Sequence, residues 1–165
     1  ISVLSRHIPT DALVFLGNSL PIREWNAAAS IDPPHPHCFA SRGANGIDGQ
    51  IATFLGLSEG EPESWAIIGD LTALYDLNAP AMLDQLANGK RRIVILNNSG
   101  GRIFSRLPSM SGLSEADKLV TENRHSRRFE QWAAVWGVEY TVWKVGDDFP
   151  EFGDVTAVLE ILIEE

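Results

Sequence analysis

Short apolar runs alternate along the chain with longer segments in which apolar residues recur at helical spacing. Short apolar runs that end at glycine or at small polar residues are typical of buried strands. We therefore predict strands at residues 12–16, 38–40, 65–69, 92–96, 138–142 and 156–162. The helical spacing and the helix-ending residues predict helices at residues 21–27, 46–57, 71–77, 80–87 and 127–136, and a mixed, loop-like segment at 105–122.

This alternation predicts the fold class. Apolar strands separated by helix-length segments indicate an α/β protein with three layers, a parallel sheet with helices on both faces. The 165 residues suit one domain, so we assign residues 1–165 to a single domain. In such sheets ligands bind beyond the carboxyl ends of the strands, and the residues that directly follow each strand are the first candidates for chemistry.

Composition narrows the function classes. The formal net charge is −9, which argues against general binding to nucleic acid or to anionic membranes. A single cysteine cannot form an intrachain disulfide and fits a reducing compartment. No apolar run approaches the ~20 residues of a membrane span, and the first residues lack the features of a signal peptide. We therefore expect a cytoplasmic protein without stable membrane insertion and, because the chain does not begin with Met, part of a longer protein.

A carboxylate and two amides follow two of the predicted strands. Asp70 comes directly after the strand at 65–69, and Asn97 and Asn98 follow the strand at 92–96. Taken singly, Asp70 is typical of a helix N-cap, and the asparagines are typical of a strand-ending turn. About 25 residues separate the two positions, enough for one crossover, so both should lie at the same end of the sheet. Carboxylate, amide and loop carbonyl oxygens would then converge, and such hard ligands suit Mg²⁺ or Ca²⁺.

The helix predicted after Asp70 adds a second device for binding anions. Mg²⁺ takes few protein ligands and shares its coordination shell with phosphate oxygens. The free N–H groups at the start of the helix would face the same phosphates. An acidic chain could thus hold a diphosphate through one metal ion and one helix end.

The Gly-Asp and Asn-Asn pairs, separated by one crossover, resemble the thiamine-diphosphate motif. Four blocks in order resemble one family, the 2-succinyl-5-enolpyruvyl-6-hydroxy-3-cyclohexene-1-carboxylate (SEPHCHS) synthases of menaquinone biosynthesis. The blocks are residues 17–23 (GNSLPIR), 41–49 (SRGANGIDG), 69–77 (GDLTALYDL) and 97–105 (NNSGGRIFS). The resemblance is close over residues 11–107 and loose elsewhere. It implies that the chain is the C-terminal domain of a three-domain enzyme, the domain that binds the diphosphate and Mg²⁺, and that the N-terminal domains are absent.

The resemblance also implies a reaction. Members of this family are thiamine-diphosphate-dependent transferases that decarboxylate 2-oxoglutarate and add the succinyl carbanion equivalent to isochorismate. The implied cofactors are thiamine diphosphate and Mg²⁺, with Mn²⁺ as a substitute, and the implied partners are the chain's own N-terminal domains and a second subunit of a homo-oligomer. Family members activate the cofactor with a glutamate from the first domain of a partner subunit. Nothing in this chain replaces that glutamate, so we expect the isolated chain to be inactive.

Individual roles follow from the resemblance. It implies that the side chains of Asp70 and Asn98 and the backbone carbonyl of Gly100 bind the metal, with Asn97 as a structural neighbour. Ile47 would wedge between the two cofactor rings and so count as catalytic. The full set implied for cofactor binding is Ser19, Gly46, Ile47, Asp70, Leu71, Thr72 and Asn98. The set implied for substrate binding is Arg23 and Arg42, for carboxylates, and Ile103, Phe104 and Leu107, for an apolar wall beside the isochorismate ring.

A physical argument also supports the role implied for Arg23 and Arg42, because both substrates are dianions and guanidinium groups bind carboxylates bidentately. Without the resemblance, Arg23 could equally be an exposed helix arginine, and the apolar residues of these sets could be ordinary packing. Leu71 stands where glycine is commoner in thiamine-diphosphate enzymes, although leucine is what this family tends to show. Ser99 stands where asparagine or glycine is often found, and only its backbone geometry should matter.

Two alternatives stay open. The chain could be a domain of another thiamine-diphosphate lyase or decarboxylase, which the block at 41–49 and Arg23 disfavour. It could also be a non-catalytic Rossmann-like module that binds a nucleotide or dimerises. No Gly-x-Gly-x-x-Gly sequence opens a helix after the first predicted strand, which argues against a dinucleotide.

Two further expectations concern the surface. The basic cluster at residues 125–128 could assist an anionic substrate, but we favour a solvated helix start. A domain separated from its partners should expose apolar surface, and we expect self-association through the face near Ile47 and Leu74.

Overall fold

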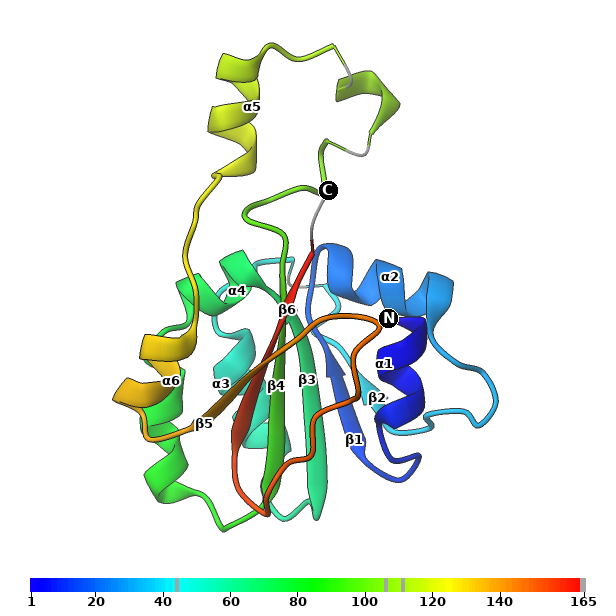
Figure 1. Cartoon of the computed structure of the whole chain (residues 1–165), viewed down its shortest axis with the longest axis vertical. Coiled ribbons are helices and arrows are strands. Elements are labelled where there is room, and N and C mark those ends of the chain that lie inside the picture. Colours follow the sequence, from blue (N-terminus) through cyan, green and yellow to red (C-terminus); the bar gives the residue numbers. More distant parts are fainter. Residues whose placement is uncertain (44, 106, 111, 164–165) are drawn as a thin grey trace.

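The computed structural model describes residues 1–43, 45–105, 107–110 and 112–163. A sheet of six strands forms the centre (Figure 1), in the order β2-β1-β3-β4-β6-β5, and all its neighbouring strands are parallel. The strands are β1 (Leu13–Leu16), β2 (Cys38–Phe39), β3 (Glu63–Gly69), β4 (Lys90–Asn97), β5 (Glu139–Trp143) and β6 (Ala157–Leu162). The predicted α/β class and all six predicted strands are confirmed, with strand ends shifted by one or a few residues.

Helices cover both faces of the sheet. Helices α1 (Ser2–His7) and α2 (Leu20–Ala28) pack on one face. The other face carries α3 (Gln50–Leu57), α4 (Asp70–Tyr75), the 3-10 helix η1 (Ala79–Gln85) and α6 (Glu130–Val135). The 3-10 helix η2 (Pro108–Met110) and α5 (Glu115–Glu122) stand beyond the carboxyl ends of the strands in Figure 1. None of the helices in the described ranges has the length and apolar composition needed to cross a lipid bilayer.

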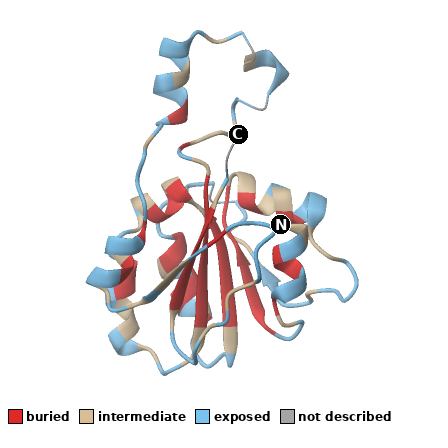
Figure 2. Cartoon of the chain, in the orientation of Figure 1, coloured by how far each residue is buried: buried red, intermediate tan, exposed pale blue. Residues whose placement is uncertain are grey.

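The strand side chains alternate between two cores. Ala66 and Ile68 of β3 pack against α3, α4 and α6, whereas Trp65 and Ile67 of the same strand pack against α1 and α2. Figure 2 shows the central strands buried along most of their length. Strands covered on both faces are apolar at nearly every position, which is why they appear in the sequence as continuous runs.

Several helix boundaries differ from the prediction. Helix α3 begins at Gln50 instead of near residue 46, because Gly49 has a φ of +67° and left-handed backbone does not continue a helix. Helix α6 begins at Glu130 instead of residue 127. The segment predicted as an α-helix at 80–87 is the 3-10 helix η1, which has proline in its first turn.

Two α-helices in the described ranges were not predicted. Helix α1 precedes the first strand, and α5 lies inside the segment predicted to be loop-like. The hydroxyl of Ser114 caps α5 by accepting a hydrogen bond from the Asp117 N–H at 3.2 Å. Leu119 and Val120 of α5 are 59% and 83% exposed. Helix α5 therefore depends on its cap and local charges, because its apolar residues, although they recur at helical spacing, are exposed and add little packing.

The two-sided core predicts a large cost for a cavity in the central strand β4. Ile95→Ala removes a fully buried side chain from one core and should lower the free energy of unfolding by about 2–5 kcal/mol. Val135→Ala in α6 is the control, because Val135 is 75% exposed and the change should stay within about 0.5 kcal/mol. Urea denaturation of both variants measures the difference, and similar losses in the two would contradict this description of the core.

Candidate functional site

Parallel pairing of β3 with β4 brings the predicted metal ligands to one edge of the sheet. Gly69, the last residue of β3, lies opposite Leu96 of β4. Asp70 follows Gly69 directly and begins α4, and Asn98 is the first residue after β4. The two side chains therefore leave the carboxyl ends of neighbouring strands, as the crossover argument predicted.

Asp70 is bound directly to the turn that follows β4. Its side chain is buried, and Oδ2 accepts a hydrogen bond from the Gly100 N–H at 2.9 Å. Oδ1 accepts from the Leu71 N–H at 2.7 Å, so this N–H, predicted to face a diphosphate, is used within the chain. Burial raises the pKa of Asp70, while the hydrogen bonds from Gly100 and Leu71 and the nearby imidazole of His125 oppose that shift.

The turn after β4 requires glycine at position 100. Ser99 and Gly100 both have positive φ, of 63° and 142°. A Cβ on Gly100 would lie 2.7 Å from the backbone oxygen of Glu122, closer than a real Cβ can approach. Glycine at this position thus lets the backbone that carries the predicted carbonyl ligand pass beside the segment that returns from α5.

Most of the predicted cofactor and metal residues surround one small cavity of about 60 Å³ at this edge. Its walls include Ser19, Ile47, Asp70, Leu71, Thr72, Asn98 and Gly100. Gly46 does not line the cavity. Its carbonyl oxygen accepts hydrogen bonds from Asn18 Nδ2 at 2.8 Å and Gln50 Nε2 at 2.5 Å, which hold the loop before α3 against the end of β1.

A second cavity, of about 580 Å³, adjoins the first. The two share wall residues that include Ser19, Ile47 and Leu71. The predicted substrate residues Arg23, Arg42, Ile103 and Phe104 all line the larger cavity. Arg23 lies in the first turns of α2, and its Nη1 donates to the Ser19 carbonyl at 2.5 Å. Leu107 lines neither cavity and is 45% exposed, so its predicted contact with substrate has no counterpart in the cavity walls.

The residues at the small cavity fit a magnesium ion by their chemistry. In the described part of the chain, no three His, Cys, Asp or Glu side chains gather as a metal-binding cluster. The predicted set needs only one carboxylate, because the other two ligands are an amide oxygen and a backbone carbonyl. Each Asp70 oxygen accepts one backbone hydrogen bond and has further acceptor capacity. An all-oxygen set of three protein ligands suits Mg²⁺, which keeps positions for water and phosphate.

Comparison with known proteins gives consistent matches. The chain is 41% identical over 151 residues to the 2-succinyl-5-enolpyruvyl-6-hydroxy-3-cyclohexene-1-carboxylate synthase of Akkermansia muciniphila, covering 92% of this chain and 28% of that protein. Proteins of the same name from Bdellovibrio bacteriovorus and Halorhodospira halophila are 48% and 41% identical, over 79% and 87% of this chain and 23% and 25% of their own lengths. The chain belongs to the SEPHCHS synthase family. It spans about a quarter of the length of these curated relatives, and no protein-family model matches it.

His125 lies at the candidate site beside Asp70, and sequence reasoning missed it. Its Nε2 lies 3.2 Å from Asp70 Oδ2, and its side chain is 9% exposed. Its backbone N–H donates to the Ser99 carbonyl at 3.2 Å. The expectation of a solvated cluster at 125–128 is therefore wrong for His125, although Arg127 and Arg128 are exposed. No sequence pattern relates His125 to Asp70. The two residues come together only because the chain returns from α5 to the end of β4.

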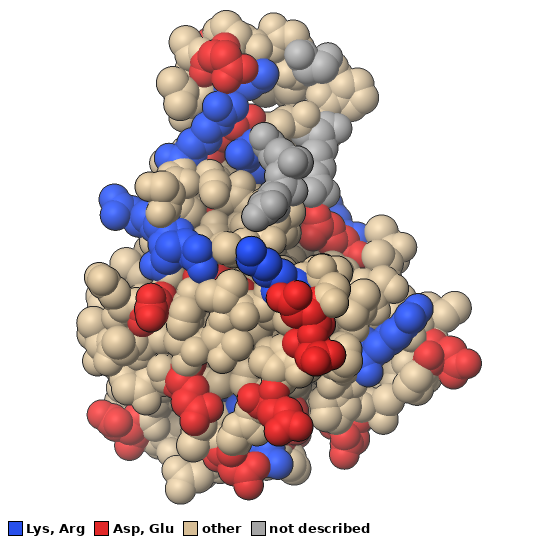
Figure 3. Space-filling view, viewed as in Figure 1, with Lys and Arg blue, Asp and Glu red and all other residues tan. Residues whose placement is uncertain are grey.

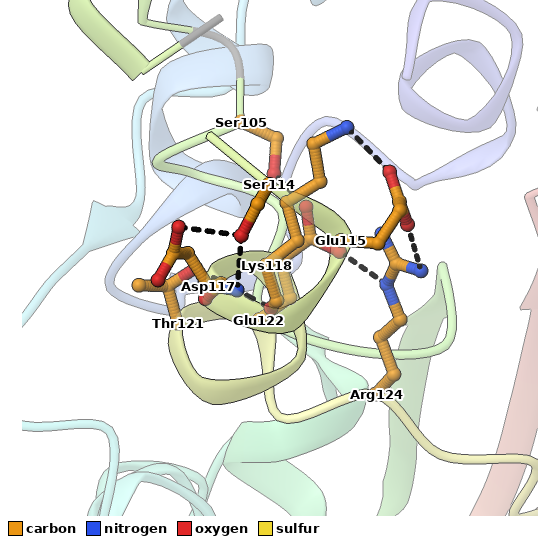
Figure 4. Close-up of polar contacts among 8 residues, drawn as sticks. All are labelled: Ser105, Ser114, Glu115, Asp117, Lys118, Thr121, Glu122 and Arg124. Atoms are coloured by element: carbon orange, nitrogen blue, oxygen red, sulfur yellow. Dashed lines mark hydrogen bonds and ion pairs between the residues drawn. The ribbon is translucent and has the colours of Figure 1, made fainter. Parts of the chain in front are cut away.

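Residues 102–124, here called the α5 segment, leave the body of the domain after the turn at 98–101 and return to it, and Glu122 closes the base of this segment (Figure 4). The Glu122 carboxylate accepts from Ser105 Oγ near the start of the segment and from Arg124 Nε, at 2.5 Å, near its end. Both bonds lower the pKa of Glu122, Arg124 being the larger cause. Glu115 forms ion pairs with Lys118 at 2.8 Å and with Arg124 at 3.3 Å. This segment also supplies walls of the larger cavity, namely Ile103, Phe104 and Thr121.

Positive charge is concentrated locally in a chain of net charge −9. On the face seen in Figure 3, Lys and Arg side chains gather mainly around the junction between the α5 segment and the body, whereas Asp and Glu predominate farther down. Arg23 and Arg42 line the larger cavity, and Arg102 lines the smaller one. An anionic ligand at this edge would therefore meet arginines in spite of the acidic composition.

Gly100→Ala should distort the turn that carries the predicted ligands. The added Cβ would meet the Glu122 carbonyl, and we expect a loss of about 2–3 kcal/mol in the free energy of unfolding. Gly56→Ala in α3 is the control, because its Cβ would meet nothing within 4 Å and should be neutral or mildly stabilising. Thermal unfolding compares the two, and a Gly100 variant as stable as the unmodified chain would show that the turn tolerates a side chain.

Proposed function

We propose that this chain is the diphosphate-binding domain of a SEPHCHS synthase, and that it binds thiamine diphosphate through Mg²⁺. One observation carries the proposal: Asp70, Asn98 and Gly100 meet at one small cavity, in a chain 41–48% identical to enzymes of that name. The whole enzyme, a transferase of menaquinone biosynthesis, would decarboxylate 2-oxoglutarate and transfer the remaining succinyl unit to isochorismate.

The metal would be held by the Asp70 carboxylate, the Asn98 amide oxygen and the Gly100 carbonyl. Asp70 is fixed by hydrogen bonds to two backbone N–H groups, so its carboxylate is oriented before a metal binds. Binding energy for the metal is therefore not spent on ordering the Asp70 side chain. Mn²⁺ prefers the same oxygen ligands and would serve as a substitute.

Ser19 and Thr72 are the proposed contacts for the diphosphate, and Gly46 with Ile47 is the proposed support for the rings. When bound, thiamine diphosphate supplies the electron sink for loss of CO₂ from a 2-oxo acid. Ile47 lines both cavities, so its side chain lies between the predicted metal end and the predicted substrate end of the site. That position supports the role of a wedge that fixes how the cofactor is bent.

Arg23 and Arg42 are the proposed partners of the substrate carboxylates. Both line the larger cavity beside Ile103 and Phe104, so positive charge and apolar surface occupy the same walls. That combination suits a dicarboxylate with a carbon ring, because guanidinium groups pair with carboxylates while the apolar wall covers the ring. Leu107 would join this wall only after a rearrangement of its segment.

The remaining part of the synthase would complete the site. This chain corresponds to about a quarter of its relatives' length, and we propose that the N-terminal domains and a second subunit supply the glutamate that activates the cofactor. The face near Ile47 and Leu74 is the proposed contact surface for that assembly.

Asp70→Ala should remove Mg²⁺-dependent binding of thiamine diphosphate and leave the fold intact. Calorimetric titration with thiamine diphosphate, with and without Mg²⁺, measures the binding, and circular dichroism checks the fold. Asp11→Ala is the matched control, since Asp11 is an exposed acid that precedes β1 at the opposite edge. Binding that survives in the Asp70 variant, or a preference of the unmodified chain for NAD or ATP, would contradict the proposal.

The isolated chain should give no product with Mg²⁺, thiamine diphosphate, 2-oxoglutarate and isochorismate. Adding the part of a relative that this chain lacks should restore turnover, because the missing carboxylate would then be present. Product is followed by chromatography, with the Asp70→Ala chain as the inactive control. Turnover by the chain alone would show that the catalytic group lies within these 165 residues.

A further inference from the structure

A carboxylate is buried in β6, where the surrounding residues are apolar. Glu160 is fully buried, between Leu159 and Ile161, and lies opposite Ile95 of β4 and Val142 of β5. A buried carboxylate costs several kcal/mol unless charged or polar groups surround it. Glu160 therefore has to be explained by what its oxygens bind.

Each oxygen of Glu160 accepts two hydrogen bonds. Oε1 accepts from Asn97 Nδ2 at 2.6 Å and from Arg128 Nε at 2.9 Å. Oε2 accepts from the Phe129 N–H at 3.3 Å and from the Tyr140 hydroxyl. Burial, followed by the bond to Glu160, raises the pKa of Tyr140 to about 12, so the hydroxyl keeps the proton that it donates. Oε1 thus binds Asn97 at the site and Arg128 before α6, whereas Oε2 binds the N-cap residue of α6 and Tyr140 of β5.

Asn97 connects this carboxylate to the turn after β4. Its Nδ2 donates to Glu160 and to the Arg127 carbonyl, at 3.0 Å, and its Oδ1 accepts from the Ser99 N–H at 3.1 Å. A carboxylate can only accept, so Glu160 fixes which end of the Asn97 amide points towards Ser99. With Nδ2 held by two acceptors, Oδ1 is left to bind the turn.

We propose that Glu160 is a positioning residue, which fixes the turn carrying Asn98 and Gly100 by orienting the amide of Asn97. The inference rests on the proposed function, because the turn matters for binding only if Asn98 and Gly100 are metal ligands. It gives a role to the first asparagine of the Asn-Asn pair. Asn97 does not need to touch the metal. Its amide is oriented by the Glu160 carboxylate in β6, and its Oδ1 in turn holds the Ser99 N–H of the turn.

The unmodified chain provides the first test. Hydrogen exchange followed by NMR should show the Ser99 N–H and the Asn97 side-chain N–H groups exchanging at least roughly tenfold more slowly than in an unstructured peptide. Exchange at the peptide rate would overturn the proposal without any variant.

Variants separate a positioning role from a general contribution to stability. Glu160→Ala should accelerate exchange at Ser99 roughly tenfold, and more than at the strand amides of Ile93 and Ile95. Glu160→Gln should restore slow exchange at Ser99, because its amide oxygen can replace Oε1, while some loss of overall stability is expected because its NH₂ group cannot accept from the Phe129 N–H. Tyr140→Phe removes a donor from Oε2 only and should leave Ser99 unchanged within about twofold. An unchanged Ser99 in the alanine variant, or equal acceleration at all amides, would refute the proposal. If the alanine variant does not fold, the glutamine and phenylalanine variants decide, since loss of protection at Ser99 in both would point to general loosening.

Metal titration links the result to function and keeps the two proposals distinguishable. Mn²⁺ affinity, measured by electron paramagnetic resonance, should fall roughly tenfold in Glu160→Ala and be retained in Glu160→Gln and Tyr140→Phe. If the unmodified chain binds no Mn²⁺, the proposed function fails, while the exchange data still decide whether Glu160 orders the turn. A loosened turn with unchanged Mn²⁺ affinity would overturn the role of Glu160 in binding.

Discussion

The N–H of Gly100 donates to Asp70 Oδ2, and this bond joins the ends of two neighbouring strands. Asp70 reaches it because β3 and β4 pair in parallel, and Gly100 reaches it because a glycine there can pass close to Glu122. The two cavities, the arginines beside them and the contact of His125 with Asp70 are all arranged around this junction. A different strand order would separate these groups even if every helix and strand were kept.

The parts of the fold that could be predicted are those set by burial. The strands β1, β3, β4 and β6 are buried along most of their length and are largely apolar, so they were visible in the sequence as continuous runs. The edge strands β2 and β5 are largely exposed or half-buried, and they were predicted from short runs of strand-forming residues. The meeting of Asp70 and Asn98 followed from crossover geometry alone. Arg23, Arg42, Ile103 and Phe104 came from the family resemblance, and all four line the larger cavity. Leu107, assigned in the same way, lies outside it.

The parts that could not be predicted depend on local or distant polar contacts. Helix α5 was missed although Ser114 and Asp117 have the spacing of a helix cap; it is held by that cap and by ion pairs of Glu115, and its apolar residues are exposed. Glu160 lies within an apolar strand pattern, and its partners are up to 63 residues away in the chain. His125 belongs to a basic cluster whose two arginines are exposed, although Arg128 also reaches Glu160. In each case the sequence shows that a charged or polar residue is present, whereas only the fold shows which groups it contacts.

The closure of the α5 segment by Glu122 has a consequence for how the site can diversify. The segment leaves and re-enters the body at almost the same point, since the Glu122 carbonyl accepts from the Gly101 N–H and its carboxylate binds both Ser105 and Arg124. Its length can therefore vary without displacing the turn beneath it. Phe104 and Thr121 belong to this segment and line the larger cavity, so a change in the segment also changes that wall. A graft of this segment from a homologue would therefore change one wall of the larger cavity and leave the turn after β4 in place.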